Sequence, residues 1–358
     1  MPLRSGLSDR SVSALALDPE NSNKIYAGTS AGVYQSLNGG DQWFLSSRGI
    51  NRLFVNVIIV DPANADSIYV GTRTDLYKTT DRGNTWFEAN RGLPIGPSFS
   101  RAIFALALDR NDTNTLYVGM ETGIYKSIDG GTTWFPVSTI QNIQALAIDP
   151  QDSKTAYAGA GDFSTGGVFK TVDGGRTWLE VDSGFLDRNV TTVAVDPQVS
   201  NTIYAGTGKG GLYKSVDGGS TWSQIHTALY FRVLIMDPQS PNTIYAGTDF
   251  GGVYRSTDGG ETWEQMNSGL GSEPSVLSLA LDLTDSGILY AGVSESGGSG
   301  PDKGVYKTTS AGKEWFRTGL TAQNISVVAI DPNDSSVVYA SVFDHSIAAS
   351  DDGGQTWR

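Results

Sequence analysis

Five arginines stand shortly before a repeated aspartate, and together they could bind an anion. Three of them lie eight places before that aspartate, one lies nine places before it and one lies five. Because the guanidinium fork matches a carboxylate, such a set would suit an acidic group on a peptide or glycan. Solvated arginines paired with acids such as Asp9 and Asp187 are the structural alternative. The five arginines are Arg10, Arg52, Arg101, Arg188 and Arg232.

Three aromatic residues, Phe99, Tyr230 and Phe231, stand near the same positions. Each could stack on a sugar ring or anchor a peptide, and each could equally pack beneath a loop. We therefore predict a ligand-binding set made of the five arginines and these three aromatic residues.

Glycoside hydrolysis is the enzymatic alternative, because it needs only two carboxylates about 5 to 10 Å apart. Acidic residues recur after a repeated tyrosine-containing strand, but nothing in the sequence selects a pair among them. They are Asp75, Glu121, Asp162, Asp249, Glu295, Asp302 and Asp344.

Other reactive chemistry has little support. The chain has no cysteine, which excludes disulfides, thiolate nucleophiles and cysteine-bound metals. Its two histidines, His226 and His345, sit in no triad or metal motif. The Gly-Gly pairs lack the lysine of a phosphate-binding loop. We predict no catalytic residue, no cofactor and no metal.

Charge and hydropathy limit the partners. The net charge of −13 argues against binding to nucleic acid or to an anionic membrane. No apolar run reaches the roughly 18 residues of a membrane span. Residues 1–6 lack the apolar core of a signal peptide, which leaves a cytoplasmic protein or a chain whose leader has been removed. The compartment stays open.

A repeat that fills the chain positions all of these residues. Each copy has an aspartate that ends an apolar run, a tyrosine eight residues later and a tryptophan near its end. The aspartates are Asp18, Asp61, Asp109, Asp149, Asp196, Asp237, Asp282 and Asp331. The tyrosines are Tyr26, Tyr69, Tyr117, Tyr157, Tyr204, Tyr245, Tyr290 and Tyr339. The tryptophans are Trp43, Trp86, Trp134, Trp178, Trp222, Trp263, Trp315 and Trp357.

Each repeat contains four short strand-like runs separated by Asp, Asn, Gly and Pro turn signals. In the first repeat they are 14–17, 24–27, 32–35 and the run that Trp43 opens. Alanine stands two places before the aspartate in six of the eight repeats, which suits an innermost strand where space tapers. The pattern predicts an all-β fold, a single closed eight-bladed β-propeller with four antiparallel strands per blade, spanning residues 1–358 as one domain.

A second motif marks the turn between the third and fourth strands. Its pattern is Ser/Thr-x-Asp-x-Gly-x-Thr-Trp, as in residues 127–134. The aspartate can accept backbone N–H groups within the turn, and glycine supplies a positive φ, so the role is structural. Asn38 and Ser310 replace the aspartate in two repeats, and those turns should survive. The motif aspartates are Asp81, Asp129, Asp173, Asp217, Asp258 and Asp352.

This motif resembles the Asp-box (BNR) repeat superfamily over the whole chain. The pattern looks most similar to photosystem-assembly-factor-like propellers, sortilin-type receptor propellers and xyloglucan-cleaving hydrolases, and the resemblance implies an extracytoplasmic location. Such hydrolases form their cleft between two tandem propellers, whereas this chain predicts one ring. Sialidases share the box but need an arginine triad with a Tyr/Glu nucleophile, which the arginines here do not form.

Length varies at only one end of the predicted blades. Aspartate to tyrosine is always eight residues, whereas tyrosine to the third strand runs from 8 to 16 and tryptophan to the next aspartate from 15 to 23. Residues 90–104, 160–167 and 293–304 are the candidate loops, because function on rigid scaffolds usually resides in variable loops. We predict a monomeric, non-catalytic binding or assembly scaffold for a protein, peptide or glycan. The alternatives are the glycoside hydrolase and a structural or engineered propeller without ligand.

The two ends of the chain predict how the ring closes. The sequence stops one residue after the last tryptophan, and residues 2–8 look like the missing part of that fourth strand. We therefore expect the N-terminal segment to complete the last blade, which would leave no exposed sheet edge. A cut within a strand also points to a trimmed, permuted or engineered chain.

Overall fold

The protein was analysed as a computed structural model, which describes residues 7, 12–51, 54–94, 102–161, 166–209, 211–227, 231–271, 274–294, 303–321, 323–331, 334–342 and 346–358. Within these ranges the regular elements are strands, and none is a helix. Consecutive strands pair antiparallel into eight blades of a propeller, which confirms the predicted fold class. The chain divides into two compact units, residues 47–230 and residues 1–46 with 231–358.

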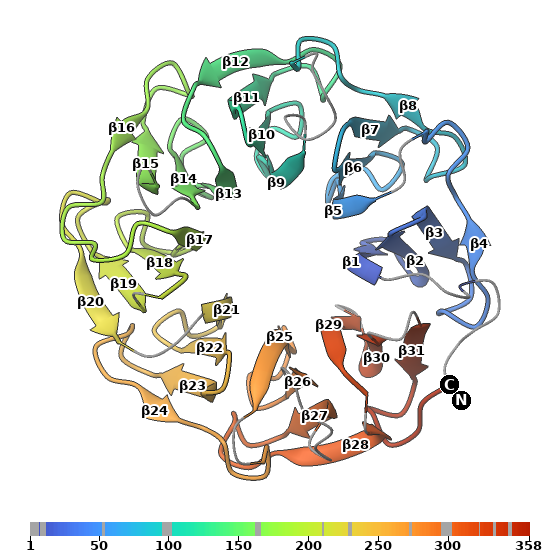
Figure 1. Ribbon diagram of the computed structural model, residues 1–358. Helices are drawn as coiled ribbons and strands as arrows, with labels where there is room; N and C mark the ends of the chain where they lie inside the picture. The colour runs from blue at the N-terminus through green and yellow to red at the C-terminus, as the bar shows by residue number, and fades with distance from the viewer. Residues whose placement is uncertain are drawn as a thin grey trace. The chain divides into compact units, whose positions relative to one another are not determined.

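The unit of residues 47–230 holds blades 2 to 5 (Figure 1). Blade 2 comprises β5 (Val55–Val60), β6 (Ile68–Thr72), β7 (Leu76–Thr79) and β8 (Phe87–Glu88). Blade 3 comprises β9 (Ile103–Leu108), β10 (Leu116–Met120), β11 (Gly123–Ser127) and β12 (Phe135–Ser138). Blade 4 comprises β13 (Ile143–Ile148), β14 (Ala156–Ala160), β15 (Gly167–Thr171) and β16 (Leu179–Glu180). Blade 5 comprises β17 (Val190–Val195), β18 (Ile203–Thr207), β19 (Leu212–Ser215) and β20 (Ser223–His226).

The other unit holds blades 1, 6, 7 and 8. Blade 1 comprises β1 (Val12–Asp18), β2 (Asn21–Thr29), β3 (Gly32–Ser36) and β4 (Phe44–Leu45). Blade 6 comprises β21 (Phe231–Met236), β22 (Ile244–Thr248), β23 (Gly252–Ser256) and β24 (Glu264–Gln265). Blade 7 comprises β25 (Ser275–Leu281), β26 (Leu289–Ser294), β27 (Gly304–Thr308) and β28 (Phe316–Thr321). Blade 8 comprises β29 (Ile325–Asp331), β30 (Asp334–Val342) and β31 (Ser346–Ser350).

The second strand of each blade is the centre of the core. All five residues of β6, β10, β14, β18 and β22 are buried. Within the two units, β6, β10, β14 and β22 each contact the first strand of the next blade. The tryptophan that opens the fourth strand also joins blades: the indole N–H of Trp134 donates to the carbonyl of Ala89 at 2.9 Å, and Trp315 donates to Met266 at 2.8 Å. Trp134 and Trp315 therefore connect adjacent blades. The hydroxyls of Tyr69 and Tyr157 do so as well, because they donate to the carbonyls of Gly130 and Gly218 in the next box.

Within the described residues, blade 8 has three strands, and Arg358 pairs with the third of them. Arg358 and Ala349 exchange two backbone hydrogen bonds of 2.9 and 3.0 Å, as a fourth strand does with a third. Leu7 is buried in a cluster with Trp43 and Tyr339, from blades 1 and 8. The remaining residues of the segment 2–8 lie outside the described residues, so completion of the blade by this segment stays a prediction.

Candidate ligand-binding face

The carboxylates of the Asp-box aspartates accept hydrogen bonds from residues of their own turns. In the box of blade 3, Asp129 accepts the backbone N–H groups of Thr132 and Thr133 at 3.0 and 2.8 Å, and it accepts the hydroxyl of Ser127 at 2.8 Å. The same bonds recur in the other predicted boxes (Asp81, Asp173, Asp217, Asp258 and Asp352). These carboxylates stabilise the turns, so a structural role accounts for their presence without a bound substrate.

The hydrogen bonds leave an electrostatic signature on these aspartates. The hydroxyl and backbone N–H of Thr262, followed by the hydroxyl of Ser256, hold the pKa of Asp258 down at about 2. A carboxylate that accepts several hydrogen bonds is stabilised in its charged form. The box therefore favours ionised aspartate over the whole range above that pKa.

The two boxes without aspartate keep the same turn. The side-chain oxygen of Asn38 accepts the N–H of Gln42 at 3.0 Å, and the hydroxyl of Ser310 accepts the N–H of Glu314 at 3.2 Å. The first glycine of the box is replaced by Arg82 in blade 2 and by Ala311 in blade 7, with φ of 56° and 54°. Both hold the left-handed conformation that glycine adopts most easily.

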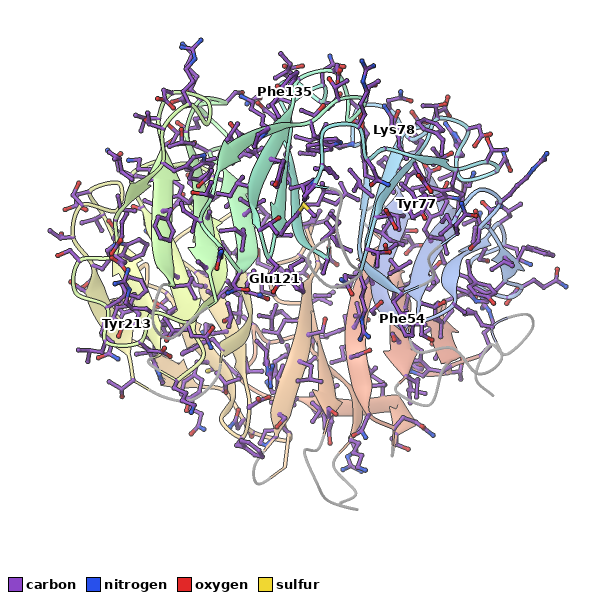
Figure 2. The ribbon with its side chains drawn as sticks, turned by 45° about the horizontal axis from the view of Figure 1, so that its top comes forward. Phe54, Tyr77, Lys78, Glu121, Phe135 and Tyr213 are labelled. Atoms are coloured by element: carbon purple, nitrogen blue, oxygen red, sulfur yellow. The ribbon has the colours of Figure 1, made fainter. Side chains whose placement is uncertain are left out.

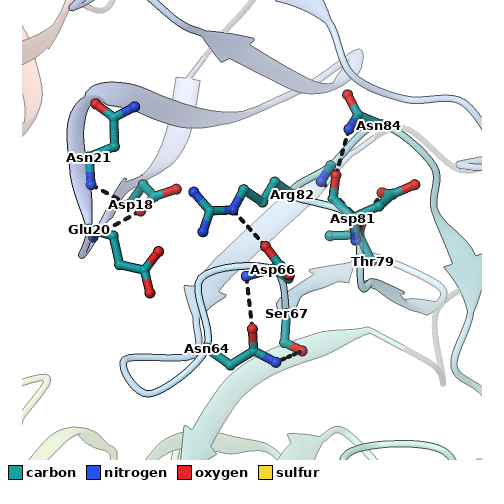
Figure 3. Close-up of polar contacts among 11 residues, drawn as sticks. Asp18, Glu20, Asn21, Asn64, Asp66, Ser67, Thr79, Asp81, Arg82 and Asn84 are labelled. Carbon is teal, nitrogen blue, oxygen red and sulfur yellow. Dashed lines mark hydrogen bonds and ion pairs between the residues drawn. The ribbon is translucent and has the colours of Figure 1, made fainter.

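The aspartates at the end of the first strand have a similar structural role. Asp18 accepts the N–H groups of Glu20 and Asn21 at 2.9 and 3.2 Å (Figure 3). Figure 3 also shows the box of blade 2, where Arg82 donates to Asp66 and Asn84 donates to the carbonyl of Asp81. This end of each blade, which carries the first-to-second and third-to-fourth turns, is called the box end below.

Lysines of the third strand connect box ends of adjacent blades. The amine of Lys126 lies 5.1 Å from the ring centroid of Tyr117 and donates to the carbonyl of Gly174, in the next box, at 2.8 Å. Lys78 and Lys170 make the same contacts. Burial, opposed by nearby aspartates, lowers the pKa of each of these amines.

The opposite end of each blade carries the connections of variable length, and it is called the varied end below. Figure 2 shows Phe54 and Glu121, from these connections, toward the lower end of their unit, with Lys78 and Phe135 toward the upper end. The ring of Phe54 is 50% exposed, and the guanidinium of Arg73 lies 4.7 Å from its centroid.

Arg188 lies at the varied end between two carboxylates. Its Nη2 donates to Glu180 at 2.5 Å, its Nε lies 3.0 Å from the carboxylate of Asp182 and donates to the carbonyl of Gly166 at 2.9 Å. Burial raises the pKa of Asp182 to about 6, although the charge of Arg188 opposes the shift. In this structure, therefore, Arg188 already has anionic partners within its own unit.

Arg232 and Phe231 are neighbours in β21 with opposite surroundings. Arg232 donates through Nε and Nη2 to one oxygen of Asp249, at 2.9 and 2.5 Å, and half of its side chain is exposed. Phe231 is 3% exposed and packs in the core, so it offers no surface for stacking. Five predicted ligand residues lie outside the described residues: Arg10, Arg52, Arg101, Phe99 and Tyr230.

Three of the carboxylates proposed for glycoside hydrolysis lie within the described ranges: Asp75, Glu121 and Asp249. Asp75 is buried and accepts the amide of Asn90 at 3.0 Å, and Asp249 is bound to Arg232. Glu121 is exposed at the varied end of blade 3. The other candidates, Asp162, Glu295, Asp302 and Asp344, and also His345, lie outside the described residues.

His226 ends β20, and burial lowers its pKa. Among the described residues, no group of three or more His, Cys, Asp or Glu side chains is placed to hold a metal ion.

The structure reveals a set of residues that the sequence analysis missed. The first strand of every blade has the same β-bulge, with one extra residue inserted opposite the second strand. This bulge position is always five residues before the first-strand aspartate. Only that interval marked it, because the residue type differs from blade to blade. The eight residues are Ser13, Asn56, Phe104, Gln144, Thr191, Arg232, Leu277 and Ser326.

The bulge position lies on the innermost strand of each blade (Figure 1). Most of its side chains are exposed, while the residue before it is apolar and buried in all eight blades. A bulge inserts a residue outside the ladder and redirects its side chain, and bulges are often found beside functional sites. The fold thus presents seven different residue types at eight positions of one repeated backbone geometry.

A glycine of the second strand lies opposite the bulge and lets the next blade approach. A Cβ on Gly119 would lie 2.5 Å from Cγ2 of Ile143, the first residue of β13 in the next blade. The same substitution at Gly71 would bring a Cβ within 2.5 Å of Ile103. Tight packing between blades therefore fixes the backbone beside these two bulge positions.

Comparison with known proteins places the chain among propellers. A family model described as "Sortilin, neurotensin receptor 3" matches residues 210–352. No curated protein matches the chain significantly. Six residue ranges carry the box motif without substitution: 79–86, 127–134, 171–178, 215–222, 256–263 and 350–357. None of the described residues forms a helix that could cross a membrane.

Three solved structures illustrate the similarity in fold. The GH74 xyloglucanase from Xanthomonas campestris is 17% identical, with a TM-score of 0.63, and the match covers 100% of this chain and 74% of that one. The computationally designed Ika8 protein is 15% identical, with a TM-score of 0.65 and 98% of both chains covered. YCF48 bound to D1 peptide is 14% identical, with a TM-score of 0.57, and covers 80% of this chain and 91% of its own. Identities this low show the fold and nothing beyond it.

Proposed function

Because the chain is an Asp-box repeat β-propeller protein, we propose that it is a non-catalytic scaffold that binds a protein or peptide through the varied ends of its blades. The observation that carries the proposal is the bulge position, where one repeated backbone geometry presents Ser, Asn, Phe, Gln, Thr, Arg, Leu and Ser in turn. Packing alone would not require such variety, because the position before it is apolar in every blade.

Charge and similarity in fold both support a peptide partner. Arg232, at a bulge position, keeps half of its side chain exposed while it binds Asp249. A guanidinium carries five N–H donors, so an arginine that holds one carboxylate can bind a second. A protein of similar fold, YCF48, has been captured with a peptide. The described carboxylates of the varied end, in contrast, are buried, ion-paired or single, which gives glycoside hydrolysis no specific support.

The test is selection from a phage-displayed library of random peptides on the full-length chain. In one variant, Phe104, Gln144 and Arg232 are each replaced by Ser, the residue that blades 1 and 8 carry at the bulge position. We expect the unmodified protein to enrich specific peptides and the triple variant to enrich none, although the triple variant is still folded at the selection temperature. Its melting temperature should fall, because Arg232→Ser leaves the buried carboxylate of Asp249 without its ion-pair partner.

The matched control replaces Phe87, Phe135 and Phe316 with Ser. These side chains are exposed on fourth strands, away from the bulge position, so enrichment should persist. Equal enrichment by the triple bulge variant, or none by the unmodified protein, would contradict the proposal. Release of reducing sugar from a β-glucan panel would instead support the hydrolase.

We also propose that residues 1–358 form one domain in which the N-terminal segment completes blade 8. A single cooperative transition by calorimetry, with equal calorimetric and van't Hoff enthalpies, would support this proposal. Two separate transitions, one for each compact unit, would contradict it.

A further inference from the structure

Four bulge positions in the unit of residues 47–230 form an uncharged row. They are Asn56, Phe104, Gln144 and Thr191, on β5, β9, β13 and β17. These four first strands are neighbours in that order along the inner side of the unit (Figure 1). The row therefore places an aromatic ring between two carboxamides, with a hydroxyl beyond them.

The two residues at the ends of the row each donate a hydrogen bond to a backbone carbonyl. The amide of Asn56 donates to the carbonyl of Ile103 in the next blade at 3.0 Å, which leaves its side-chain oxygen as an acceptor. The hydroxyl of Thr191 donates to the carbonyl of Gly206 at 3.3 Å and can still accept a hydrogen bond. These hydrogen bonds hold both side chains in place and leave each of them one acceptor oxygen for a ligand.

Within the described residues, the side chains at the centre of the row make no such hydrogen bond. Gln144 is exposed, and within the part of the chain that the structure describes its carboxamide has no hydrogen-bond partner. Phe104 is 38% exposed, although the side chains before and after it in β9 are buried. Serine occupies the same bulge position in blades 1 and 8, so the repeated fold does not require a large side chain there.

We propose that Phe104 and Gln144 are specificity-determining residues that recognise an uncharged peptide segment with an apolar side chain. The proposal rests on the function proposed above and names the part of the partner that this unit reads. A carboxamide carries the same donor and acceptor as a peptide group, so Gln144 and Asn56 can pair with main-chain N–H and C=O. Phe104 is the apolar anchor between them.

Charge and exposure both favour this ligand. No member of the row carries a charge, so a charged ligand group placed there would lose its hydration without compensation. Less than half of the Phe104 ring is accessible, which suits contact with an alkyl or aromatic side chain better than the flat stacking of a sugar ring. The row is thus distinct from Arg232, which suits a carboxylate.

The experiment uses synthetic peptides derived from those enriched on the unmodified protein, with affinity measured by fluorescence polarisation. We expect an uncharged consensus with one apolar residue. Phe104→Ser should weaken binding by about tenfold or more, as expected for an interface anchor, and Gln144→Leu should weaken it several-fold. Replacing the apolar residue of the peptide with Ser should cost the unmodified protein about tenfold but leave Phe104→Ser almost unchanged.

Two variants serve as controls. Phe135→Ser removes a ring that is 56% exposed on β12, and Gln355→Leu changes an exposed glutamine in a box turn; neither should alter affinity. If peptides bind but Phe104→Ser and Gln144→Leu bind them equally well, the row is not the recognition element, although the proposed function stands. Binding of a neutral oligosaccharide panel through Phe104, without peptide binding, would overturn both proposals.

Discussion

The two ends of each blade use polar residues in opposite ways. At the box end the same side chains make the same bonds in blade after blade, as Asp129 and Asp258 do with their threonines. At the varied end one backbone feature, the bulge of the first strand, holds a different side chain in almost every blade. We therefore expect the box ends, where the residue types repeat, to contribute most to stability. We expect recognition at the varied ends, where only the backbone geometry repeats.

The largest expected effect comes from a tryptophan near the box end. Trp134 is 2% exposed and donates to Ala89 of the previous blade, so Trp134→Ala should lower the free energy of unfolding by about 3 to 5 kcal/mol. Phe135→Ala, one residue away but 56% exposed, should change it by no more than about 0.5 kcal/mol. Urea denaturation measures both. Equal losses would mean that the fourth strand, and not the indole, carries the contact.

A smaller effect is expected for the lysines that connect box ends. Lys126→Met removes a charged hydrogen bond to Gly174 and the contact with Tyr117, and should cost about 1 to 2 kcal/mol because the amine is only partly buried. Lys154→Met, at an exposed turn position, is the matched control. Thermal unfolding compares them, and equal melting temperatures for the two variants would show that the contact contributes nothing.

Blade 8 offers an independent test of this connection. Ala349 stands opposite Tyr339, where five other blades have lysine, and the backbone of Arg358 pairs with that of Ala349. The guanidinium of Arg358 forms ion pairs with Asp41 of blade 1 and with Asp351, so it can replace the missing amine. Arg358→Met should therefore lower the melting temperature, as Lys126→Met does. An unchanged melting temperature would mean that the side chain of Arg358 makes no stabilising contact.

The contrast between the ends also explains what the sequence could predict. The structural roles of Asp129, Trp134 and Tyr117 recur at fixed intervals along the sequence, so the spacing alone identified their blades and turns. The bulge was invisible because no residue type marks it: Phe104 and Gln144 share only a distance to the next aspartate. The pairing of Arg188 was equally hidden, since Glu180 and Asp182 face it only once β16 and the following connection have folded.

A stabilising change is expected where a box departs from glycine. Ala311 holds φ of 54°, so Ala311→Gly should relieve backbone strain and raise stability by up to about 1 kcal/mol. Gly39 occupies the equivalent place in blade 1 with φ of 65°, and Gly39→Ala should lower stability by a similar amount. Denaturant midpoints report both. A loss of stability in Ala311→Gly would mean that the entropy of the unfolded chain dominates.

The smallest predicted effect is a dependence on pH with opposite signs at the two ends. Hydrogen bonds hold the pKa of Asp258 at about 2, below the value of about 4 in an unfolded chain, so its contribution is present above pH 4 and is lost as the pH falls toward 2. Burial raises the pKa of Asp182 to about 6, so folding favours its protonated form, and stability decreases as the pH rises from about 4 to 6.

Two asparagine variants separate these contributions. Measured as urea midpoints from pH 2 to 8, Asp258→Asn should remove part of the loss between pH 4 and 2 and leave the range above pH 4 parallel to the unmodified protein. Asp182→Asn should instead remove the decline between pH 4 and 6. If both variants flatten the same range, Asp182 titrates like a box aspartate, and its burial between Glu180 and Arg188 does not persist in solution.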